Sequence, residues 1–359
     1  MAKKWISPSL LLILSLSMAA NAAVPAIYIF GDSLVDVGTN DYRQTIARAD
    51  FPYNGIDFPG SKPTGRFSNG LNTADTLARQ MGFSRSPPPY LSLLNNTNNL
   101  NSHIQLGINF ASGGSGLLDT TGSSRYGSAV TLTEQVKQFN SVRKTIDRLQ
   151  GENATNRFLS KSIFITSVGS NDIMDFYDSN NSSTLNKQDY VNTLISAYEK
   201  HLRRLYSLGA RKFGVISVPP IGCCPYYRAE NPKSGCLEDL NKYARIFHSS
   251  LKTLLKEIRR EFKDVKYSLG NAYEMVKSFM DNPLPFGFKE VKTACCGNGT
   301  YNGHSPCLPD AHLCSNRHEY LFWDLYHPTQ AAAELAALTL YGGSKEFATP
   351  INFRELARL

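Results

Sequence analysis

The pattern that most limits the fold of this chain is an alternation of short apolar runs with longer amphipathic stretches. Five runs have the length and composition of β-strands, and they span residues 26–30, 105–110, 162–168, 212–218 and 265–269. The first, third and fourth are almost entirely apolar. Such runs are typical of central strands in a parallel sheet that is covered on both faces.

Between these runs, apolar residues recur every three or four positions, as on the buried side of a helix. The helices expected from this spacing are 133–150, 190–208, 237–262 and 329–341. Pro328 stands where the last of them opens, which suits a first helical turn. The alternation predicts an α/β fold with an open, mostly parallel sheet and helices on both sides.

Two Gly/Pro-rich stretches, 51–70 and 282–309, interrupt this alternation and are expected to be long surface excursions. The sequence contains no internal repeat and no convincing linker, so a single domain is expected over residues 23–359.

Residues 1–22 have the features of a cleaved signal peptide. Two lysines are followed by an apolar run from Leu10 to Ala20, too short to span a bilayer comfortably, and by the small-x-small sequence at 20–22. We therefore expect secretion to the extracellular space, the apoplast or cell wall, and no transmembrane segment. Five Asn-x-Ser/Thr triplets make some glycosylation expected in an exported chain; they begin at Asn95, Asn153, Asn180, Asn181 and Asn298.

The seven cysteines all lie in the C-terminal half: Cys223, Cys224, Cys236, Cys295, Cys296, Cys307 and Cys314. Disulfides are their default use in an oxidising compartment, and the adjacent pairs lack the usual spacing of zinc ligands. We expect Cys223 or Cys224 to pair with Cys236, and Cys295 and Cys296 to pair with Cys307 and Cys314. One cysteine is left over, and the sequence does not say which.

The formal net charge is +8 and the basic residues are scattered. A nucleic-acid partner would need a concentrated basic patch with aromatic platforms, and the sequence has none. The excess positive charge would allow weak association with acidic cell-wall polymers. The oligomeric state is not readable from the sequence.

Candidate catalytic residues follow the expected strands and precede the last helix. Ligands of an open α/β sheet bind at the carboxyl ends of its strands. The first strand is followed by Gly31-Asp32-Ser33-Leu34, the second by a Gly-rich loop at 111–116, and the third by Gly169-Ser170-Asn171-Asp172. A segment from Phe322 to Pro328 precedes the last helix.

These loops contain the groups that acyl transfer requires. Ser33 can serve as nucleophile once His327 takes its proton, and Asp324 can orient the imidazole from three residues away. The oxyanion would be met by the N–H groups of Ser33 and Gly113 and by the side-chain amide of Asn171. Each motif alone is weak; their joint occurrence in this order is what favours the hypothesis.

The same segments resemble the four blocks of the SGNH hydrolases, specifically the plant-type GDSL esterase/lipases. Further stretches are similar to that family as well, at residues 62–70, 107–114, 218–223, 293–297 and 322–324. The resemblance covers about residues 26–341. It departs at Cys224, where the family has another residue, and at Leu71, where arginine is common.

The resemblance implies a flavodoxin-like three-layer αβα sandwich with a five-stranded sheet. It implies the roles already given for Ser33, His327, Asp324, Gly113 and Asn171. Arg66 and Asn69 either lie near the substrate mouth or stabilise the long excursion, and the sequence does not separate these.

The sequence thus predicts a secreted esterase/lipase that hydrolyses carboxylic esters of a lipid or an acylated metabolite through an acyl-serine intermediate. No metal or organic cofactor is expected. One alternative is an acyltransferase that uses the same acyl-enzyme. Another is a secreted binding or defence protein on a catalytically retired scaffold.

Overall fold

The computed structural model describes residues 23–94, 97–179 and 186–359, and its main feature is one sheet of mostly parallel strands. In spatial order the strands are β10 (Ala348–Thr349), β5 (Lys266–Gly270), β4 (Lys212–Ile216), β3 (Ile163–Ser167), β1 (Ile27–Gly31) and β2 (Gly107–Asn109). The five parallel strands are those expected from the sequence, and their ends differ by at most two residues.

The sheet has six strands rather than five. The additional strand, β10, pairs antiparallel with β5 through only two residues, Ala348 opposite Gly270 and Thr349 opposite Leu269. A two-residue strand is too short to produce an alternating pattern, so periodicity could not reveal it.

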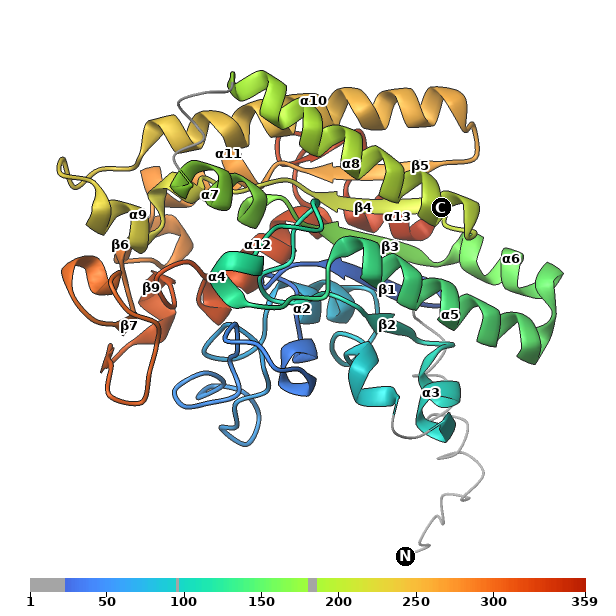
Figure 1. Cartoon of the computed structure of the whole chain (residues 1–359), viewed down its shortest axis with the longest axis horizontal. Coiled ribbons are helices and arrows are strands. Elements are labelled where there is room, and N and C mark those ends of the chain that lie inside the picture. Colours follow the sequence, from blue (N-terminus) through green and yellow to red (C-terminus); the bar gives the residue numbers. More distant parts are fainter. Residues whose placement is uncertain (1–22, 95–96, 180–185) are drawn as a thin grey trace, which may run out of the picture.

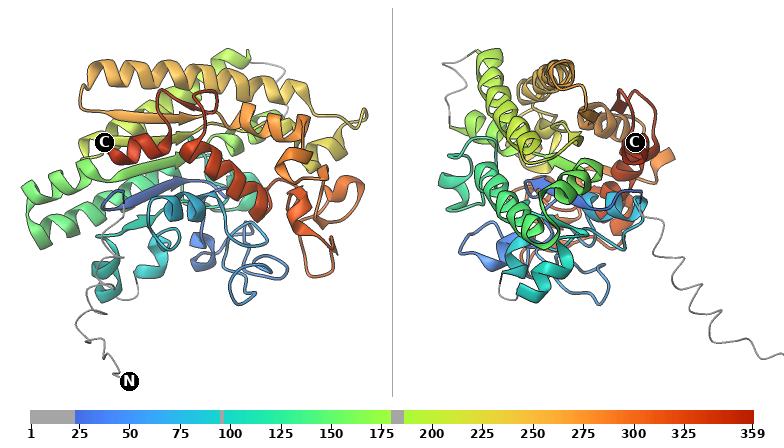
Figure 2. Two further views of the ribbon diagram at one scale, coloured as in Figure 1. Left: turned by 180° about the vertical axis from the view of Figure 1, so that it is seen from behind. Right: turned by 90° about the vertical axis from the view of Figure 1, so that its right-hand side faces the viewer.

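Helices cover both faces of the sheet, as Figures 1 and 2 show. One face carries α5 (Leu132–Gln150), α8 (Lys187–Ser207) and α10 (Glu238–Glu261), and the other carries α2 (Thr73–Gln80), α12 (Gln330–Gly342) and α13 (Phe353–Arg358). The remaining helices are α3 (Thr97–His103), α4 (Ser123–Tyr126), α6 (Glu152–Lys161), α7 (Ser170–Asp178), α9 (Pro225–Glu230) and α11 (Ala272–Asp281). This arrangement confirms the expected three-layer αβα sandwich.

The core between β1 and α5 is aromatic. Tyr28 and Phe30 of β1 pack against Phe139 of α5 with ring centroids 5.0 and 5.9 Å apart, and Phe164 of β3 joins them. All four side chains are fully buried. The interior strand that precedes the nucleophile motif is therefore packed from one side against a long helix.

The start of α12 differs from the expectation. Thr329 is the N-cap, and its hydroxyl accepts a hydrogen bond from the N–H of Ala332. Pro328 therefore precedes the cap rather than lying in the first turn. A threonine side chain can satisfy a free N–H of the first turn, whereas a proline cannot, so the threonine sets the boundary.

The two surface excursions contact each other beside the carboxyl ends of the strands. In the structure the second excursion extends past its expected end at residue 309, as far as residue 323. It contains two small sheets, β6 (Glu290–Ala294) with β9 (Tyr320–Phe322) and β7 (Cys296–Gly297) with β8 (His312–Leu313). Asp57 of the first excursion forms an ion pair of 2.6 Å with Arg317, and Asn54 accepts a hydrogen bond from the buried indole of Trp323.

Three disulfides resolve the pairing that the sequence left open: Cys223–Cys236, Cys295–Cys314 and Cys296–Cys307. The last two crosslink the second excursion, and Trp323 packs with their four cysteines in one buried cluster. Cys224 is the free cysteine, and it is buried.

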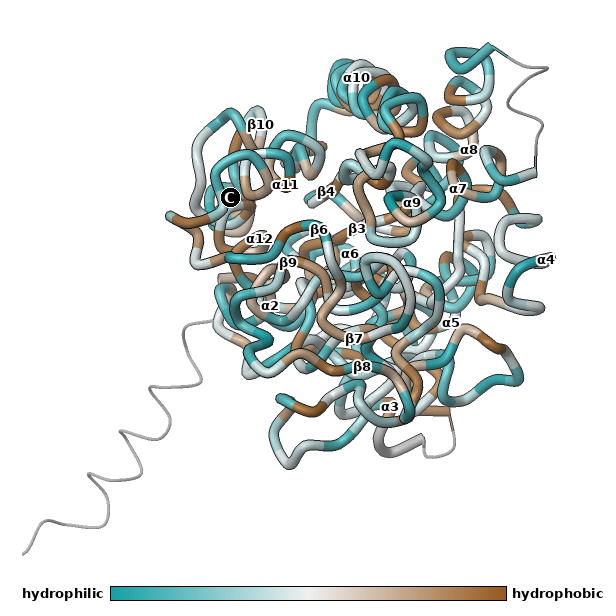
Figure 3. Tube along the Cα trace, turned by 90° about the vertical axis from the view of Figure 1, so that its left-hand side faces the viewer, coloured by the Kyte–Doolittle hydropathy of each residue, from teal (hydrophilic) through white to brown (hydrophobic). Residues whose placement is uncertain are grey.

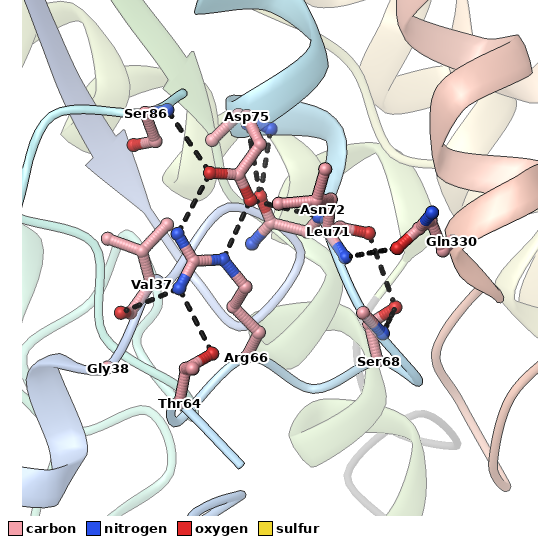
Figure 4. A network of polar contacts seen from close by, with 12 residues as sticks. Val37, Gly38, Thr64, Arg66, Ser68, Leu71, Asn72, Asp75, Ser86 and Gln330 are labelled. Atoms are coloured by element: carbon pink, nitrogen blue, oxygen red, sulfur yellow. Dashed lines mark hydrogen bonds and ion pairs between the residues drawn. The ribbon is translucent and has the colours of Figure 1, made fainter. Parts of the chain in front are cut away.

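Arg66 and Asn69 both stabilise the first excursion. The Arg66 guanidinium forms a two-pronged ion pair with Asp75 of α2 at 2.7 and 2.8 Å, and it also donates to Thr64 (Figure 4). The amide of Asn69 donates to Asp57 and accepts from the N–H of Gln330 at the start of α12. Both side chains are almost fully buried, so the structure assigns them a scaffold position.

The expected signal peptide, residues 1–22, lies outside the described residues, as do the glycosylation candidates Asn95, Asn180 and Asn181. Asn153 and Asn298 are exposed. Among the residues that are described, no helix combines the length and apolar character needed to cross a membrane.

Candidate active site

Ser33 lies two residues after β1, at the carboxyl edge of the sheet. The strand ends at Gly31, where the fold leaves no room for a side chain: a Cβ there would lie 2.0 Å from the carbonyl oxygen of Ser167 on β3. The backbone of Gly31 is also held by the buried side chain of Gln135, which both donates to its carbonyl and accepts from its N–H. The loop that carries the serine therefore starts from a rigid point.

His327 and Asp324 lie in the turn between β9 and α12. One carboxylate oxygen of Asp324 accepts the N–H groups of Tyr326 and His327, each at 2.8 Å, which folds the turn back on itself. The other oxygen lies 2.8 Å from Nδ1 of the His327 ring. The spacing of three residues thus allows the carboxylate to hold both the backbone and the ring of the histidine.

The two segments meet although 294 positions separate them in the sequence. Nε2 of His327 lies 2.8 Å from Oγ of Ser33. Since Nδ1 faces a carboxylate, the proton of a neutral ring belongs on Nδ1, and Nε2 is left to accept from the serine hydroxyl. The ring is also packed against Phe67, with centroids 4.9 Å apart.

Asp324 is suited to remain ionised. Burial alone would raise its pKa, but the nearby His327 charge, the hydrogen bond to that ring and the two backbone N–H groups outweigh burial and lower the pKa below its usual range. A carboxylate that stays charged at neutral pH can stabilise an imidazolium beside it.

One of the expected oxyanion donors is already engaged. The N–H of Gly113 donates to Oδ2 of the buried Asp36 at 2.8 Å, so it cannot face a substrate, and this part of the prediction conflicts with the structure. Nothing in the local sequence points to that contact, because Asp36 lies 77 positions away. Gly113 must still be small, since a Cβ would lie 2.6 Å from the Phe67 ring that supports His327.

The next residue, Gly114, lines the pocket around Ser33, as Asn171 does. The backbone of Gly114 has a φ of 82°, in the left-handed region that glycine favours. Asn171 donates through its side-chain amide to the carbonyl of Ser115 at 2.9 Å, which uses one of its two amide hydrogens and leaves the other for a ligand. Within the Gly-rich loop that the sequence indicated, the structure thus favours Gly114 over Gly113 as the residue that faces the pocket.

Asp172 ties the Gly-rich loop to the start of α7. Its buried carboxylate accepts the N–H groups of Leu117 and Leu118 and the hydroxyl of Thr121. Asp172 therefore holds in place the segment that directly follows the Gly-rich loop containing Gly114.

The pocket itself has a volume of about 150 Å³. Besides the residues above, its wall includes aromatic and apolar side chains from both excursions, from α7 and from the turn before α12; among them are Phe51, Met174, Pro306, Leu325 and Tyr326. Most of these come from loops, and nothing in their local sequence marks them as pocket residues.

Asp32 is a buried carboxylic acid next to the nucleophile. One of its oxygens accepts the N–H of Leu34, and the other is buried without a hydrogen-bond partner among the described residues. Burial raises the pKa of Asp32 to about 7, against the opposing effects of the Leu34 N–H and of His327. The folded protein therefore holds a proton here at pH values where an unfolded chain does not.

The proton bound to Asp32 leads to a prediction about the pH dependence of stability. An exposed aspartate has a pKa of about 3.9, so between about pH 4 and pH 7 the folded state binds more protons at Asp32 than the unfolded state. The free energy of unfolding then falls as pH rises through that window. We expect Asp32→Asn to flatten this part of the profile, measured by urea unfolding at pH 5 and pH 8. An unchanged difference between the two pH values would contradict the assignment.

Comparison with known proteins identifies the family of this chain. The family model described as GDSL-like lipase/acylhydrolase matches residues 27–340. Among similar Arabidopsis thaliana proteins, GDSL esterase/lipase At5g55050 is 38% identical over 93% of this chain and 90% of its own. GDSL esterase/lipase At1g29660 is 37% identical over 99% of both chains, and GDSL esterase/lipase LTL1 is 38% identical over 91% of this chain and 89% of its own.

Proposed function

This chain belongs to the family of GDSL-like lipases and acylhydrolases, and we propose that it hydrolyses carboxylic esters through an acyl-enzyme formed on Ser33. The observation that carries the proposal is the continuous hydrogen-bonded line from Asp324 through His327 to the serine oxygen, with both links at 2.8 Å. A line of this kind is what activates a hydroxyl as a nucleophile.

The first half of the reaction forms the acyl-enzyme. Ser33 Oγ attacks the ester carbonyl carbon while its proton passes to Nε2 of His327, and Asp324 stabilises the resulting imidazolium. The N–H groups of Ser33 and Gly114 and the free amide hydrogen of Asn171 stabilise the negative oxygen of the tetrahedral intermediate. When the intermediate collapses, the imidazolium returns the proton to the leaving alcohol.

The second half repeats these steps with water. Nε2 takes a proton from the water as it attacks the acyl carbon, and the collapse of the second intermediate returns the proton to Ser33 and releases the carboxylic acid. An alcohol that replaced water here would make the protein an acyltransferase, with the same residues in the same roles.

We also propose that the chain is exported and acts outside the cell, in the apoplast or cell wall, as one domain over residues 23–359. Three disulfides support an oxidising compartment, and the exposed positions of Asn153 and Asn298 are compatible with glycosylation. Weak association with acidic cell-wall polymers remains part of this proposal.

Covalent labelling tests the nucleophile directly. A phosphonate ester should add one label per chain, located by mass spectrometry on the peptide that contains Ser33. Ser33→Ala should remove the label, whereas Ser207→Ala, at an exposed serine of α8, should keep it. Labelling that persists in Ser33→Ala would overturn the assignment. Product analysis with acceptor alcohols present would distinguish hydrolysis from acyl transfer.

A further inference from the structure

A second cavity lies directly behind the pocket that contains Ser33. The two share four wall residues: Leu34, Pro219, Cys224 and Tyr326. The second cavity, called the apolar cavity below, lies between the end of β4, strand β9 and the helices α11 and α12. Figure 3, which faces the carboxyl ends of the strands, shows these elements side by side.

The wall of the apolar cavity is suited to a hydrocarbon. No charged side chain lines it within the described part of the chain. Met275, Val276 and Phe279 of α11 line the cavity. Ala333 and Ala336 of α12 also line it, and their small side chains leave space for a ligand. The hydroxyl of Ser217 is already engaged, since it accepts the N–H of Ala272 and contacts Nδ1 of His248. Thr73, Ser167 and Tyr326 carry the other hydroxyls of a wall that is otherwise mostly apolar, so a polar occupant would lose hydration with little compensation.

The wall residues that the two cavities share are small or largely apolar. Leu34 follows the nucleophile directly, and Cys224 Sγ lies 3.6 Å from the carbonyl oxygen of Tyr326. Burial raises the pKa of the Cys224 thiol to about 12, so the group is neutral and behaves as a small hydrophobe. Cys224 thus contributes to the apolar surface that is shared by the pocket around Ser33, called the ester pocket below, and the apolar cavity.

We propose that the apolar cavity holds the acyl chain of the substrate, so that the preferred esters are those of fatty acids rather than of acetate. This inference rests on the function proposed above. The alcohol must leave and water must enter before the acyl-enzyme can be hydrolysed, so the part of the substrate that stays bound belongs behind the serine. The ester pocket, which includes Arg48, Ser170 and Asn171, is left for the polar atoms and the alcohol.

Filling the apolar cavity tests the proposal. For wild type, kcat/KM toward p-nitrophenyl esters should rise about fourfold for each methylene that becomes buried, from acetate to octanoate. Ala336→Phe places a ring in the cavity; if it takes the room of three methylenes, octanoate hydrolysis should fall about 60-fold. Acetate hydrolysis should stay within about twofold, because an acetyl group does not reach the cavity.

Matched variants separate this effect from simple damage. Ala331→Phe makes the same change on the same helix at a half-buried position that does not line the apolar cavity, so its chain-length profile should follow wild type. Met275→Ala should extend the preference to longer acyl chains. An unchanged profile in Ala336→Phe, or a change in the preference among alkyl acetates instead, would overturn the proposal.

Binding provides a readout that does not need turnover. The Ser33→Ala protein should bind dodecanoate in calorimetric titration, and adding Ala336→Phe should weaken that binding at least tenfold. If wild type hydrolyses no ester but this binding pattern is found, the proposed catalytic function fails and the cavity assignment stands. If esters are hydrolysed but dodecanoate binding is absent or insensitive to Ala336→Phe, the cavity assignment fails alone.

Discussion

Replacing His327 with alanine is expected to lower kcat for a p-nitrophenyl ester by about 10⁶-fold, with a much smaller effect on KM. Without the imidazole, the Ser33 hydroxyl loses the acceptor of its proton, because that acceptor is Nε2 of His327, 2.8 Å from the serine oxygen. Because Ser33, His327 and Asp324 act as a unit, Ser33→Ala should lower kcat by about as much. The double variant should lower kcat little further than either single variant.

Replacing the orienting carboxylate of Asp324 should lower kcat by less than replacing His327. Asp324→Asn keeps an oxygen for the two backbone N–H groups but presents an amide to Nδ1. The ring then favours the tautomer with its proton on Nε2, which cannot accept from serine, and kcat should fall about 10⁴-fold.

An exposed histidine supplies the control for these variants. His312 lies in β8 and is exposed to solvent, so His312→Ala should retain activity within about twofold. Steady-state kinetics on one ester measures all the variants. Turnover that survives in His327→Ala would refute the triad, and a wild type that hydrolyses no ester and takes no phosphonate label would favour a retired scaffold.

The largest expected loss of stability follows from Arg66→Met. This change removes the partner of Asp75, whose side chain is completely buried, and leaves an uncompensated charge in the interior (Figure 4). Breaking one side of a buried ion pair typically costs about 3–5 kcal/mol. The N–H groups of Asn72 and Ser86 still contact the carboxylate, but they are neutral dipoles and cannot replace a charge.

Urea unfolding of the oxidised protein measures this effect. Lys277→Met, which removes an exposed ion pair with Asp281 one helical turn away, is the matched control and should change the free energy of unfolding by about 0.5 kcal/mol or less. Similar losses in both variants would show that burial does not distinguish the two pairs. Residual activity per folded molecule should be unaffected in Arg66→Met at low temperature, because the guanidinium does not line the pocket around Ser33.

The sequence alone predicted the parallel sheet, the flanking helices and the identity of the residues that meet at its edge. These features depend on local patterns: runs of apolar residues determine strands and helices, and a serine, a histidine and a carboxylate are recognisable by their chemistry. Ser33 and Asn171 could be assigned to one site because the parallel strands before them bring their carboxyl ends to one edge, whereas His327 was assigned from the Asp-x-x-His segment that precedes the last helix.

Other features depended on partners distant in the sequence. The N–H of Gly113 is taken by Asp36, so the neighbouring Gly114 lines the pocket instead. The same holds for the pairing that leaves Cys224 free and for the salt bridge that assigns Arg66 to the scaffold. Whether a hydrogen bond or a disulfide forms depends on differences of a fraction of an ångström in the distance between two segments. The chain brings those segments together only on folding.

The apolar cavity is the clearest example of what only the tertiary structure decided. Most of its wall comes from β4, β9, α11, α12 and the loops beside them, and the apolar residues that line it read in the sequence as ordinary core. Local patterns determine which side chains avoid water, because that depends on their own chemistry. Whether those side chains fill the space between them or leave room for a ligand depends on how the separate elements pack, and the sequence of any one element does not contain that information.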